Sequence, residues 1–511
     1  MKHAYPWARP LLAALFSFIA LGTSAQQAWR PFRPGLIYTY EVPGSTSTGP
    51  YTTVGIYTLR LDSAYVTATG DSAWAFNRVL RETTGQVPAE GLYGRFRKSR
   101  NNLFGQRLRW QPGSTEYTLE TVTEGTAQSA TSLLLRPQAA VASTWVANAA
   151  SNITATLTSR GLQTVNGQSD MVATITLSTG PVIRLSQNYG LIEGPQWLTL
   201  NGSPRQWVAT QLPATVAQSP YSPLRLFDLQ PGDEIGYQAF PIIITPFECS
   251  QVRSLRRFSA RSQVGDSLIY TFQEQTRTEN LSVGAPGCSA TPGTYYSGIA
   301  TYRWAFSLST GKSRQFTDTP MLTGEYRMSS GGVFLSRGIV QIQPGGSGCT
   351  GSQQIVYDQL FTYGANDNTF GRLPDIDPLV CFSPDLGLGA IRSRSTAITY
   401  YRRTRNGTTT TCGSPSSFVN LLPTRAAQAA AIATLHPNPA TEAATLTLAM
   451  PARPGTTLRL TDALGRAVWR APVPVGQTAV AVPLAGQPAG LYLLHLTGPD
   501  GASATWKLTH E

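Results

Sequence analysis

GDSLIYTFQEQTRT, at residues 265 to 278, contains the two signals that recur through this sequence. It opens on Gly-Asp-Ser, a corner whose short polar side chains cap neighbouring backbone groups. Leu268, Tyr270 and Phe272 then alternate with other residues, which is the period of a half-buried strand. The stretch therefore predicts a turn followed by a β-strand.

The same pattern occurs earlier in the chain, as GDSAWAFNRVLRET at residues 70 to 83. Each copy follows a Pro-Gly turn and precedes a Gly-Leu phrase: RPGLIYTYEV (33–42) and NYGLIEG (188–194) flank the first copy, QPGDEIGYQAF (230–240) and DLGLGAI (385–391) the second. Gly35 precedes Gly190 by 155 residues, and Gly232 precedes Gly387 by the same number. This spacing predicts a duplicated β domain.

The first copy is one residue out of step with the second, because Trp74 and Phe76 carry its alternation. A shift of one residue turns every side chain to the other face of a sheet, so we expect a bulge or a gap between the copies. The seam lies near QLPATVAQSPYSPL (211–224), where three prolines interrupt the strand pattern.

Length and composition favour several β domains. The 511 residues include 47 glycines and 36 prolines among short apolar runs, and a single core seldom organises more than about 300 residues. We predict an all-β protein made of two related β-sandwich or β-sheet domains and a small immunoglobulin-like C-terminal sandwich. The expected parts are a signal peptide (1–25), β domain 1 (26–215), β domain 2 (216–423), a linker (424–434) and a C-terminal domain (435–511).

The first 25 residues have the pattern of a secretory signal. Lys2 and Arg9 precede an apolar run from Leu11 to Leu21, and Ala25 offers a small residue before a cleavage point. No later stretch reaches about 18 consecutive apolar residues, so no transmembrane span is expected in the mature chain. The sequence predicts export.

The formal net charge of +12 comes almost entirely from arginine, because only four of the 40 basic residues are lysines. Such a skew is typical of codon bias rather than of a specific nucleic-acid partner. The positive field would still attract lipopolysaccharide or other anionic glycans in a salt-dependent way.

The five cysteines and four histidines restrict the chemistry. Cys249, Cys288, Cys349, Cys381 and Cys412 lie in one span without CxxC spacing, which predicts up to two disulfides and one remaining thiol, in any of 15 arrangements. No histidine occurs from residue 26 to 435. This absence excludes Ser-His-Asp and Cys-His catalysis and His-ligated metals from that region. We expect no metal or cofactor.

The last 77 residues contain an ordered set of turn and strand motifs. LHPNPATEAATLTLAM begins at residue 435, LRLTDALGRAV alternates on both sides of an Asp/Gly turn, and GLYLLHLTGPDGASATWKL repeats that pattern around Gly498, Asp500 and Gly501. Two hairpins and a preceding strand predict a small β-sandwich. An alternative is an immunoglobulin-like binding module.

These motifs resemble the type A C-terminal sorting domain of cargo for the type IX (Por) secretion system of Bacteroidota. The matching positions are Pro437, Asn438, Pro439, Asp462, Gly465, Arg466, Gly490, Tyr492 and Lys507. Family members commonly end on an apolar or basic strand, whereas this chain ends on His510 and Glu511. The resemblance implies recognition by the type IX machinery, passage across the outer membrane, and release or attachment to surface lipopolysaccharide. YGLIEGPQWL (189–198) and ITYYRRTRNGTTTTCGSP (398–415) also resemble uncharacterised secreted surface proteins.

A basic stretch, GRFRKSRNNLFGQRLRW at residues 94 to 110, is the candidate for contact with a polyanion. Its cations alternate with aromatic residues, as in proteins that grip anionic polymers. These cations are Arg95, Arg97, Lys98, Arg100, Arg107 and Arg109. The structural alternative is a hairpin about the Asn-Asn pair with its arginines in water. RSLRRFSAR (253–261) and RSRSTAITYYRRTR (392–405) allow the same two interpretations.

Two further sets of residues allow a functional and a structural interpretation. Asp367, Asp375 and Asp377 have the oxygen ligands of a calcium loop, but without EF-hand spacing, so solvated turn carboxylates are favoured. Trp110, Trp145, Trp197 and Trp304 would serve as sugar-stacking platforms if exposed, although core positions are favoured.

The sequence favours an exported, non-catalytic binding or structural protein of the cell surface or medium. The alternative is a secreted glycan hydrolase, because two carboxylates suffice for that reaction without histidine. No pair of carboxylates occurs in a familiar catalytic context.

Overall fold

The computed structural model describes residues 28–43, 56–82, 95–125, 128–196, 205–239, 249–280, 288, 293–315, 321–329, 332–341, 349–362, 369–372, 380–393, 396–422, 432–498 and 503–511. Over these ranges the chain is nearly all β, which confirms the predicted class. It divides into two compact units, Met1–Ser414 and Pro415–Glu511. The expected signal peptide lies outside the described residues.

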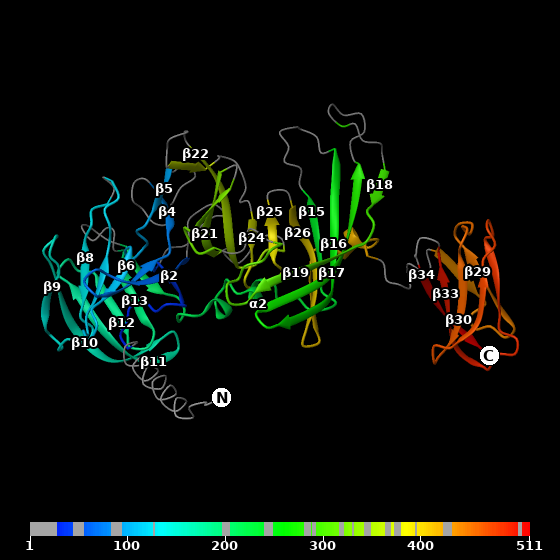
Figure 1. Ribbon diagram of the computed structural model, residues 1–511, viewed down its shortest axis with the longest axis horizontal. Coiled ribbons are helices and arrows are strands. Elements are labelled where there is room, and N and C mark those ends of the chain that lie inside the picture. Colours follow the sequence, from blue (N-terminus) through cyan, green and yellow to red (C-terminus); the bar gives the residue numbers. More distant parts are fainter. Residues whose placement is uncertain are drawn as a thin grey trace, which may run out of the picture. The chain divides into compact units, whose positions relative to one another are not determined.

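A 12-stranded antiparallel sheet, here called the first sheet, contains most of the N-terminal half of unit 1 (Figure 1). Its order is β8-β7-β6-β3-β2-β1-β14-β13-β12-β11-β10-β9. The strands are β1 (Ile37–Glu41), β2 (Ile56–Val66), β3 (Ser72–Phe76), β6 (Arg107–Trp110), β7 (Tyr117–Glu120), β8 (Ser132–Leu135), β9 (Thr144–Asn148), β10 (Ile153–Val165), β11 (Gln168–Leu177), β12 (Val182–Ser186), β13 (Gly190–Pro195) and β14 (Gln206–Ala209). Its core combines aromatic and aliphatic residues, and Phe32 contacts the rings of Tyr38, Phe76 and Phe104.

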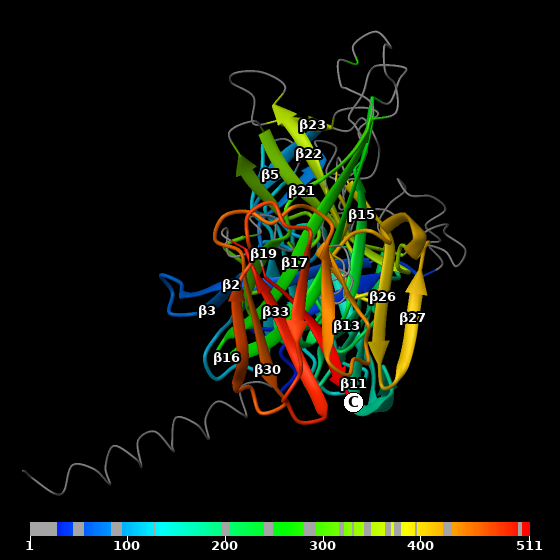
Figure 2. The same ribbon diagram turned by 90° about the vertical axis from the view of Figure 1, so that its right-hand side faces the viewer.

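A 15-stranded sheet, the second sheet, contains the rest of unit 1. Its main path is β18-β17-β16-β15-β26-β25-β24-β22-β23-β5-β4, with β19, β20, β21 and β27 attached at its sides. The strands are β4 (Val79–Glu82), β5 (Arg95–Ser99), β15 (Glu234–Ala239), β16 (Ser250–Val264), β17 (Ser267–Asn280), β18 (Gly293–Tyr296), β19 (Ala300–Ser307), β20 (Tyr326–Ser329), β21 (Gly332–Gln341), β22 (Gln353–Thr362), β23 (Thr369–Arg372), β24 (Val380–Phe382), β25 (Ala390–Ser393), β26 (Thr396–Arg405) and β27 (Thr408–Cys412). Figure 2 shows β26 and β27 side by side, paired as an antiparallel hairpin. Unit 1 also contains the short helices η2 (Val216–Gln218) and α2 (Pro223–Leu226), whereas η3 (Pro415–Phe418) belongs to unit 2.

The two sheets share a strand order, which supports the duplication inferred from the sequence. The first sheet runs β3-β2-β1-β14-β13-β12, and the second runs β17-β16-β15-β26-β25-β24. In the first sheet β1 pairs with β14, and in the second sheet β15 pairs with β26, so an early strand lies beside a late strand in both. A bulge also interrupts each central hairpin, between Leu61 and Ser63 in the first sheet and between Phe258 and Ala260 in the second. The domain boundaries suggested by the sequence stay predictions.

Strands β4 and β5 belong to the second sheet although they come from the N-terminal part of the chain. β5 pairs with β23 through Phe96 and Phe370, while β6 pairs with β3 and β7. The expected hairpin over residues 94–110 is therefore wrong. Asn101 and Asn102 are buried rather than exposed at a hairpin tip, and Asn102 accepts a hydrogen bond from Tyr57 and donates to the carbonyl of Asn77. These buried contacts hold the chain where it passes from one sheet to the other.

Hydrogen bonds also join the two sheets at Thr58 of β2. Its amide donates to Oγ1 of Thr323 over 3.0 Å, and the amide of Thr323 donates to Oγ1 of Thr58 over 3.1 Å. Ile37 and Ile56 of the first sheet pack in the hydrophobic core of the second. The sheets of unit 1 are thus connected by polar and apolar contacts.

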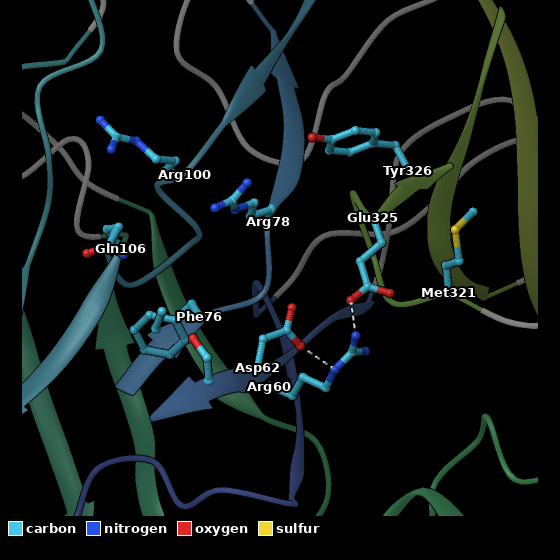
Figure 3. Close-up of a pocket in the computed structure, with 11 residues that line it drawn as sticks. Arg60, Asp62, Phe76, Arg78, Arg100, Gln106, Met321, Glu325 and Tyr326 are labelled. Atoms are coloured by element: carbon cyan, nitrogen blue, oxygen red, sulfur yellow. Dashed lines mark hydrogen bonds and ion pairs between the residues drawn. The ribbon is translucent and has the colours of Figure 1, made fainter. Parts of the chain in front are cut away.

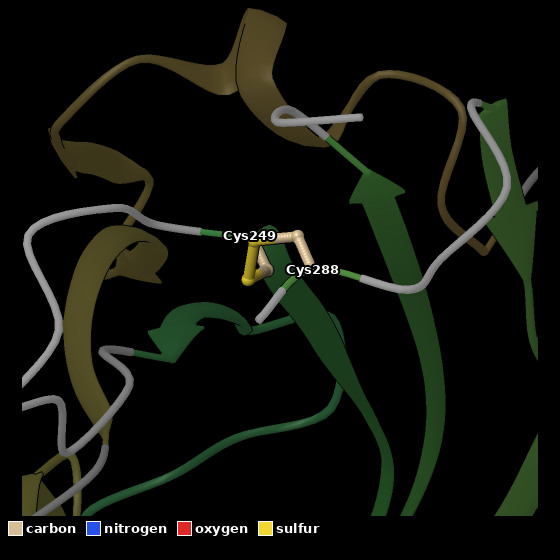
Figure 4. The surroundings of a disulfide bond; sticks show 2 residues. All are labelled: Cys249 and Cys288. Carbon is tan, nitrogen blue, oxygen red and sulfur yellow. A yellow bond between two sulfur atoms is a disulfide. The ribbon is translucent and has the colours of Figure 1, made fainter. Parts of the chain in front are cut away.

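Two disulfides staple the second sheet, and the buried Cys381 takes part in neither of them. Cys249 pairs with Cys288 across a Cα–Cα distance of 5.3 Å (Figure 4), and Cys349 pairs with Cys412 across 5.7 Å. The prediction of two disulfides and one remaining cysteine is confirmed. Cys349–Cys412 ties the segment before β22 to the end of β27.

Unit 2 contains a seven-stranded β-sandwich. Its sheets run β28-β29-β32 and β31-β30-β33-β34. The strands are β28 (Ala433–His436), β29 (Ala443–Leu448), β30 (Thr457–Asp462), β31 (Ala467–Pro472), β32 (Ala479–Pro483), β33 (Gly490–Thr497) and β34 (Ser503–His510). Alternate residues such as Leu446, Leu458, Leu460 and Leu494 form its core. The β30–β31 and β33–β34 hairpins confirm those read from the sequence.

Candidate sorting motif and ligand pocket

The Pro-Asn-Pro segment connects β28 to β29 and is fixed by its asparagine. Nδ2 of Asn438 donates to the carbonyl oxygen of Lys507 over 2.7 Å, and Oδ1 accepts from the amide of Thr509 over 2.9 Å. The peptide bonds before Pro437 and Pro439 are both cis. One amide side chain therefore binds this segment to the last strand, β34.

The Asp-x-x-Gly-Arg motif forms the turn of the β30–β31 hairpin. Oδ1 of Asp462 accepts from the amides of Leu464 and Arg466, and Oδ2 accepts from Nε of Arg466 over 2.7 Å. The amide of Gly465 closes the turn on the carbonyl of Asp462 over 2.9 Å. Burial alone would raise the pKa of Asp462, but the hydrogen bonds from Arg466 and Leu464 lower it below its usual value. The motif has a clear structural role in the turn.

Gly490 and Tyr492 lie at the start of β33, beside the end of the chain. Gly490 pairs with His510, and the Tyr492 hydroxyl donates to the carbonyl of Pro488 over 2.6 Å. His510 is buried, with its ring nitrogens 2.6 Å from the carbonyl of Thr441 and 3.2 Å from that of Pro488. Sequence reasoning treated His510 only as an unusual ending and missed this contact.

The nine motif positions gather at one end of the four-stranded sheet. Asp462 is the register partner of Tyr492, which in turn is opposite Leu508, and Lys507 is opposite Leu493. Asn438 reaches the same end through its bonds to β34. Lys507 contributes its backbone carbonyl to this network, while its side chain is exposed.

The basic stretch is divided between the two sheets, and three of its arginines are ion-paired. Arg97 pairs with Glu124, while Arg107 and Arg109 both pair with Glu120, at 2.5 and 2.7 Å. Arg109 also contacts Asp71 over 2.8 Å. Lys98 lies 5.7 Å from the ring centre of Phe370, and Arg95 opens β5. Contact of this stretch with a polyanion stays a prediction.

Arg100 differs from those three because it lines a pocket of about 430 Å³ (Figure 3). The pocket lies between the β2–β3 hairpin of the first sheet and the segment that leads into β20 of the second. Arg60, Asp62 and Glu325 form one wall, and Arg78 and Arg100 approach from the opposite side. Sequence reasoning did not single out Arg78, Asp62 or Glu325, since they are separated by long stretches of chain.

An ion-pair network joins the three charged side chains of the first wall of the pocket. Nε of Arg60 lies 2.7 Å from Oδ1 of Asp62, and Nη2 lies 2.8 Å from Oε1 of Glu325. Burial would lower the pKa of Arg60, but the carboxylates of Glu325 and Asp62 raise it. Burial also raises the pKa of Glu325, against the effect of Arg60. This wall therefore carries one cation and up to two carboxylates.

Arg78 and Arg100 bring positive charge to the other wall. Both are exposed, and among the residues that the structure describes neither guanidinium forms an ion pair. Burial raises the pKa of the Tyr326 hydroxyl at the rim, and the charge of Arg78 opposes this rise. The pocket thus has two arginines available for an anionic group.

Three of the four singled-out tryptophans belong to the core. Trp110, Trp145 and Trp304 expose 8%, 6% and 8% of their surface, too little to stack on a sugar. Trp197 and the three aspartates of the suggested calcium loop lie outside the described residues.

Over the described ranges, no three His, Cys, Asp or Glu side chains form a metal-binding group. No helix in those ranges has the length and apolar character needed to cross a membrane.

Comparison with known proteins does not establish a family. No family model and no curated protein matches the chain. Dimeric latent PorU from Porphyromonas gingivalis is 11% identical with a TM-score of 0.13, over 93% of this chain and 34% of PorU. The BSP domain of a biofilm associated protein is 8% identical with a TM-score of 0.13, over 94% of this chain and 98% of that domain. The chain therefore spans about a third of the PorU chain, and neither likeness is strong enough to assign a function.

Proposed function

We propose that this protein is exported across the outer membrane to the cell surface or medium, where it acts as a non-catalytic binding or structural protein. Its C-terminal sandwich serves as a type IX sorting signal that the secretion machinery recognises. The observation that carries this proposal is the convergence of the nine motif residues at one end of a folded sandwich. The signal-like N-terminus of the sequence agrees with it.

The sandwich is suited to act as a separate recognition module. Unit 2 has its own hydrophobic core, formed by residues from all seven strands and the segments between them. Asn438 links the N-terminal end of this module to β34, so the Pro-Asn-Pro segment and the chain terminus are presented together. Surface lipopolysaccharide is the proposed site of attachment if the exported chain is not released.

A fusion experiment tests whether the module is sufficient for sorting. A periplasmic reporter protein carrying a Sec signal is joined to residues 415–511 and expressed in a bacterium that has a type IX system. We expect the reporter in the surface or medium fraction, and an Asn438→Ala fusion should accumulate in the periplasm. Periplasmic retention of the unaltered fusion would contradict the proposal.

Glycan hydrolysis is not favoured by the pocket that the structure describes. Its two carboxylates, Asp62 and Glu325, both pair with Arg60. A hydrolase needs one carboxylic acid to protonate the leaving group and a second carboxylate as nucleophile or base. Because Asp62 and Glu325 share the same arginine, their surroundings do not differ in the way that the two roles require. The pair is better suited to binding.

A further inference from the structure

We propose that the pocket between the two sheets of unit 1 binds a sugar unit carrying a carboxylate, a hexuronate, with Arg78 and Arg100 as its anion-binding residues. This inference rests on the proposed function of the protein as a binding protein and names the ligand class of that function.

The balance of charge in the pocket favours an anionic ligand. Asp62 and Glu325 each form an ion pair with Arg60, and neither forms one with Arg78 or Arg100 of the opposite wall. Arg78 and Arg100 remain without an ion pair among the described residues. Arg97, Arg107 and Arg109, by contrast, are each matched with a carboxylate close by. Since an arginine fork binds a carboxylate with two parallel hydrogen bonds, the two available arginines are suited to that group.

The β-bulge of β2 contributes the second part of the site. Asp62 is the extra residue between the paired positions Leu61 and Ser63, and its side chain lines the pocket. Bulges commonly redirect a side chain next to a functional site. Oδ1 of Asp62 contacts Arg60, and no described residue donates to Oδ2. A sugar hydroxyl can donate to that oxygen.

The remaining lining combines polar and apolar groups, which suits a pyranose ring with its hydroxyl groups and apolar C–H faces. The Tyr326 hydroxyl and the Gln106 side chain offer hydrogen bonds at the rim, and Phe76 and Met321 add apolar surface. A volume of about 430 Å³ lies in the range of small-molecule sites. A bare carboxylate would use only the arginines, whereas a hexuronate would use both walls.

The test is calorimetric titration of the purified, full mature chain with digalacturonate. Galactobiose is the uncharged sugar control, and trialanine is the control for a free carboxylate without sugar hydroxyls. We expect digalacturonate to bind and neither galactobiose nor trialanine to bind at the same concentration. Arg78→Ala and Arg100→Ala should each weaken binding about tenfold or more, as expected for loss of a charged hydrogen bond. Tyr326→Phe should weaken it less.

Arg314→Ala is the matched control, because it removes one exposed positive charge outside the pocket. It should change the affinity less than twofold, and melting curves verify that every variant is folded. No binding of digalacturonate, equal binding of galactobiose or trialanine, or unchanged affinity in both pocket variants would overturn the assignment. The titration does not depend on export, so its failure would leave the sorting proposal intact, and a failure of sorting would leave the pocket intact.

Discussion

Gly190 and Gly387 hold equivalent places in the two halves of unit 1. Both have positive φ angles, of 80° and 62°. A Cβ on Gly190 would lie 2.4 Å from the carbonyl oxygen of Pro31, and a Cβ on Gly387 would lie 2.8 Å from that of Arg225. In each half, the segment before the first strand packs against the backbone of the later Gly-Leu turn. The two glycines that end the 155-residue spacings, Gly190 and Gly387, therefore each make a close backbone contact of the same kind.

Gly190→Ala should destabilise unit 1 by about 3 kcal/mol, because the methyl group combines left-handed backbone strain with a clash against main-chain atoms. Gly167→Ala is the matched control: its φ is 82°, but a Cβ there meets nothing within 4 Å, so the cost is about 1 kcal/mol. Urea unfolding followed by tryptophan fluorescence measures both. Equal losses would show that the contact with Pro31 is not important.

Removing the Cys349–Cys412 disulfide with alanine at both positions should lower the stability of unit 1 by about 2 to 4 kcal/mol. The bridge closes a long loop, with a sequence separation of 63, and so restricts the unfolded chain. Cys381→Ala is the comparison, since that thiol forms no disulfide. Thermal unfolding with and without reductant checks the result, and a double variant as stable as the native chain would count against a structural role.

Glu124→Gln should destabilise unit 1 by about 2 kcal/mol near pH 7, because Glu124 receives hydrogen bonds from Ser99 and the Arg100 amide as well as the Arg97 ion pair. Burial would raise the pKa of Glu124, but these contacts lower it from 4.5. The charged form therefore contributes stability that is complete above about pH 4.5 and is lost as the pH falls through the lower native pKa.

The difference in unfolding free energy between the native chain and Glu124→Gln should accordingly shrink on acidification below that pH. Glu116→Gln serves as control, because the side chains of Glu116 and its partner Arg136 are more exposed than those of Glu124 and Arg97. A constant difference from pH 7 to pH 3 would show that the charge on Glu124 is not the cause.

Asn438→Ala should loosen β34 in the folded protein. The side chain makes two hydrogen bonds to this strand, so its removal should cost about 1 to 2 kcal/mol locally. Hydrogen exchange of the peptide covering residues 503–511 should speed up, and Asn438→Asp, which keeps the acceptor for Thr509, should have an intermediate effect. Unchanged exchange in Asn438→Ala would mean that the Pro-Asn-Pro segment does not hold the terminal strand.

Sequence periodicity predicted the all-β class, the hairpins of unit 2 and the repeated turns, because these depend on neighbouring residues. Leu268, Tyr270 and Phe272 are all buried as their alternation requires. The path of β4 and β5 into the second sheet was not predictable. Phe96 pairs with Phe370, which lies more than 270 residues further along the chain. No local pattern in RFRKSRNN shows whether its strand pairs with a distant strand or with the next one in a hairpin.

The sorting motif could be predicted from the sequence and the pocket could not, because their residues differ in how far apart they lie along the chain. The turn at Asp462 is encoded within five residues, so the sequence was enough to place it. The pocket combines Arg60, Asp62 and Arg78 with Arg100 and with Glu325 from the other sheet, and only the folded chain brings them together. The basic stretch identifies Arg100 as a candidate by its neighbours in sequence, yet three of those neighbours are ion-paired, whereas Arg100 lines the pocket.

The most direct test of the central claim is the location of the full-length protein and of a chain ending at Thr424 in the native host. An antibody to residues 26–423 detects both forms in periplasmic, surface and medium fractions. The account predicts that the full-length protein reaches the surface or medium while the truncated chain stays in the periplasm. Equal export of both would contradict it, because the C-terminal sandwich would then not be the sorting signal.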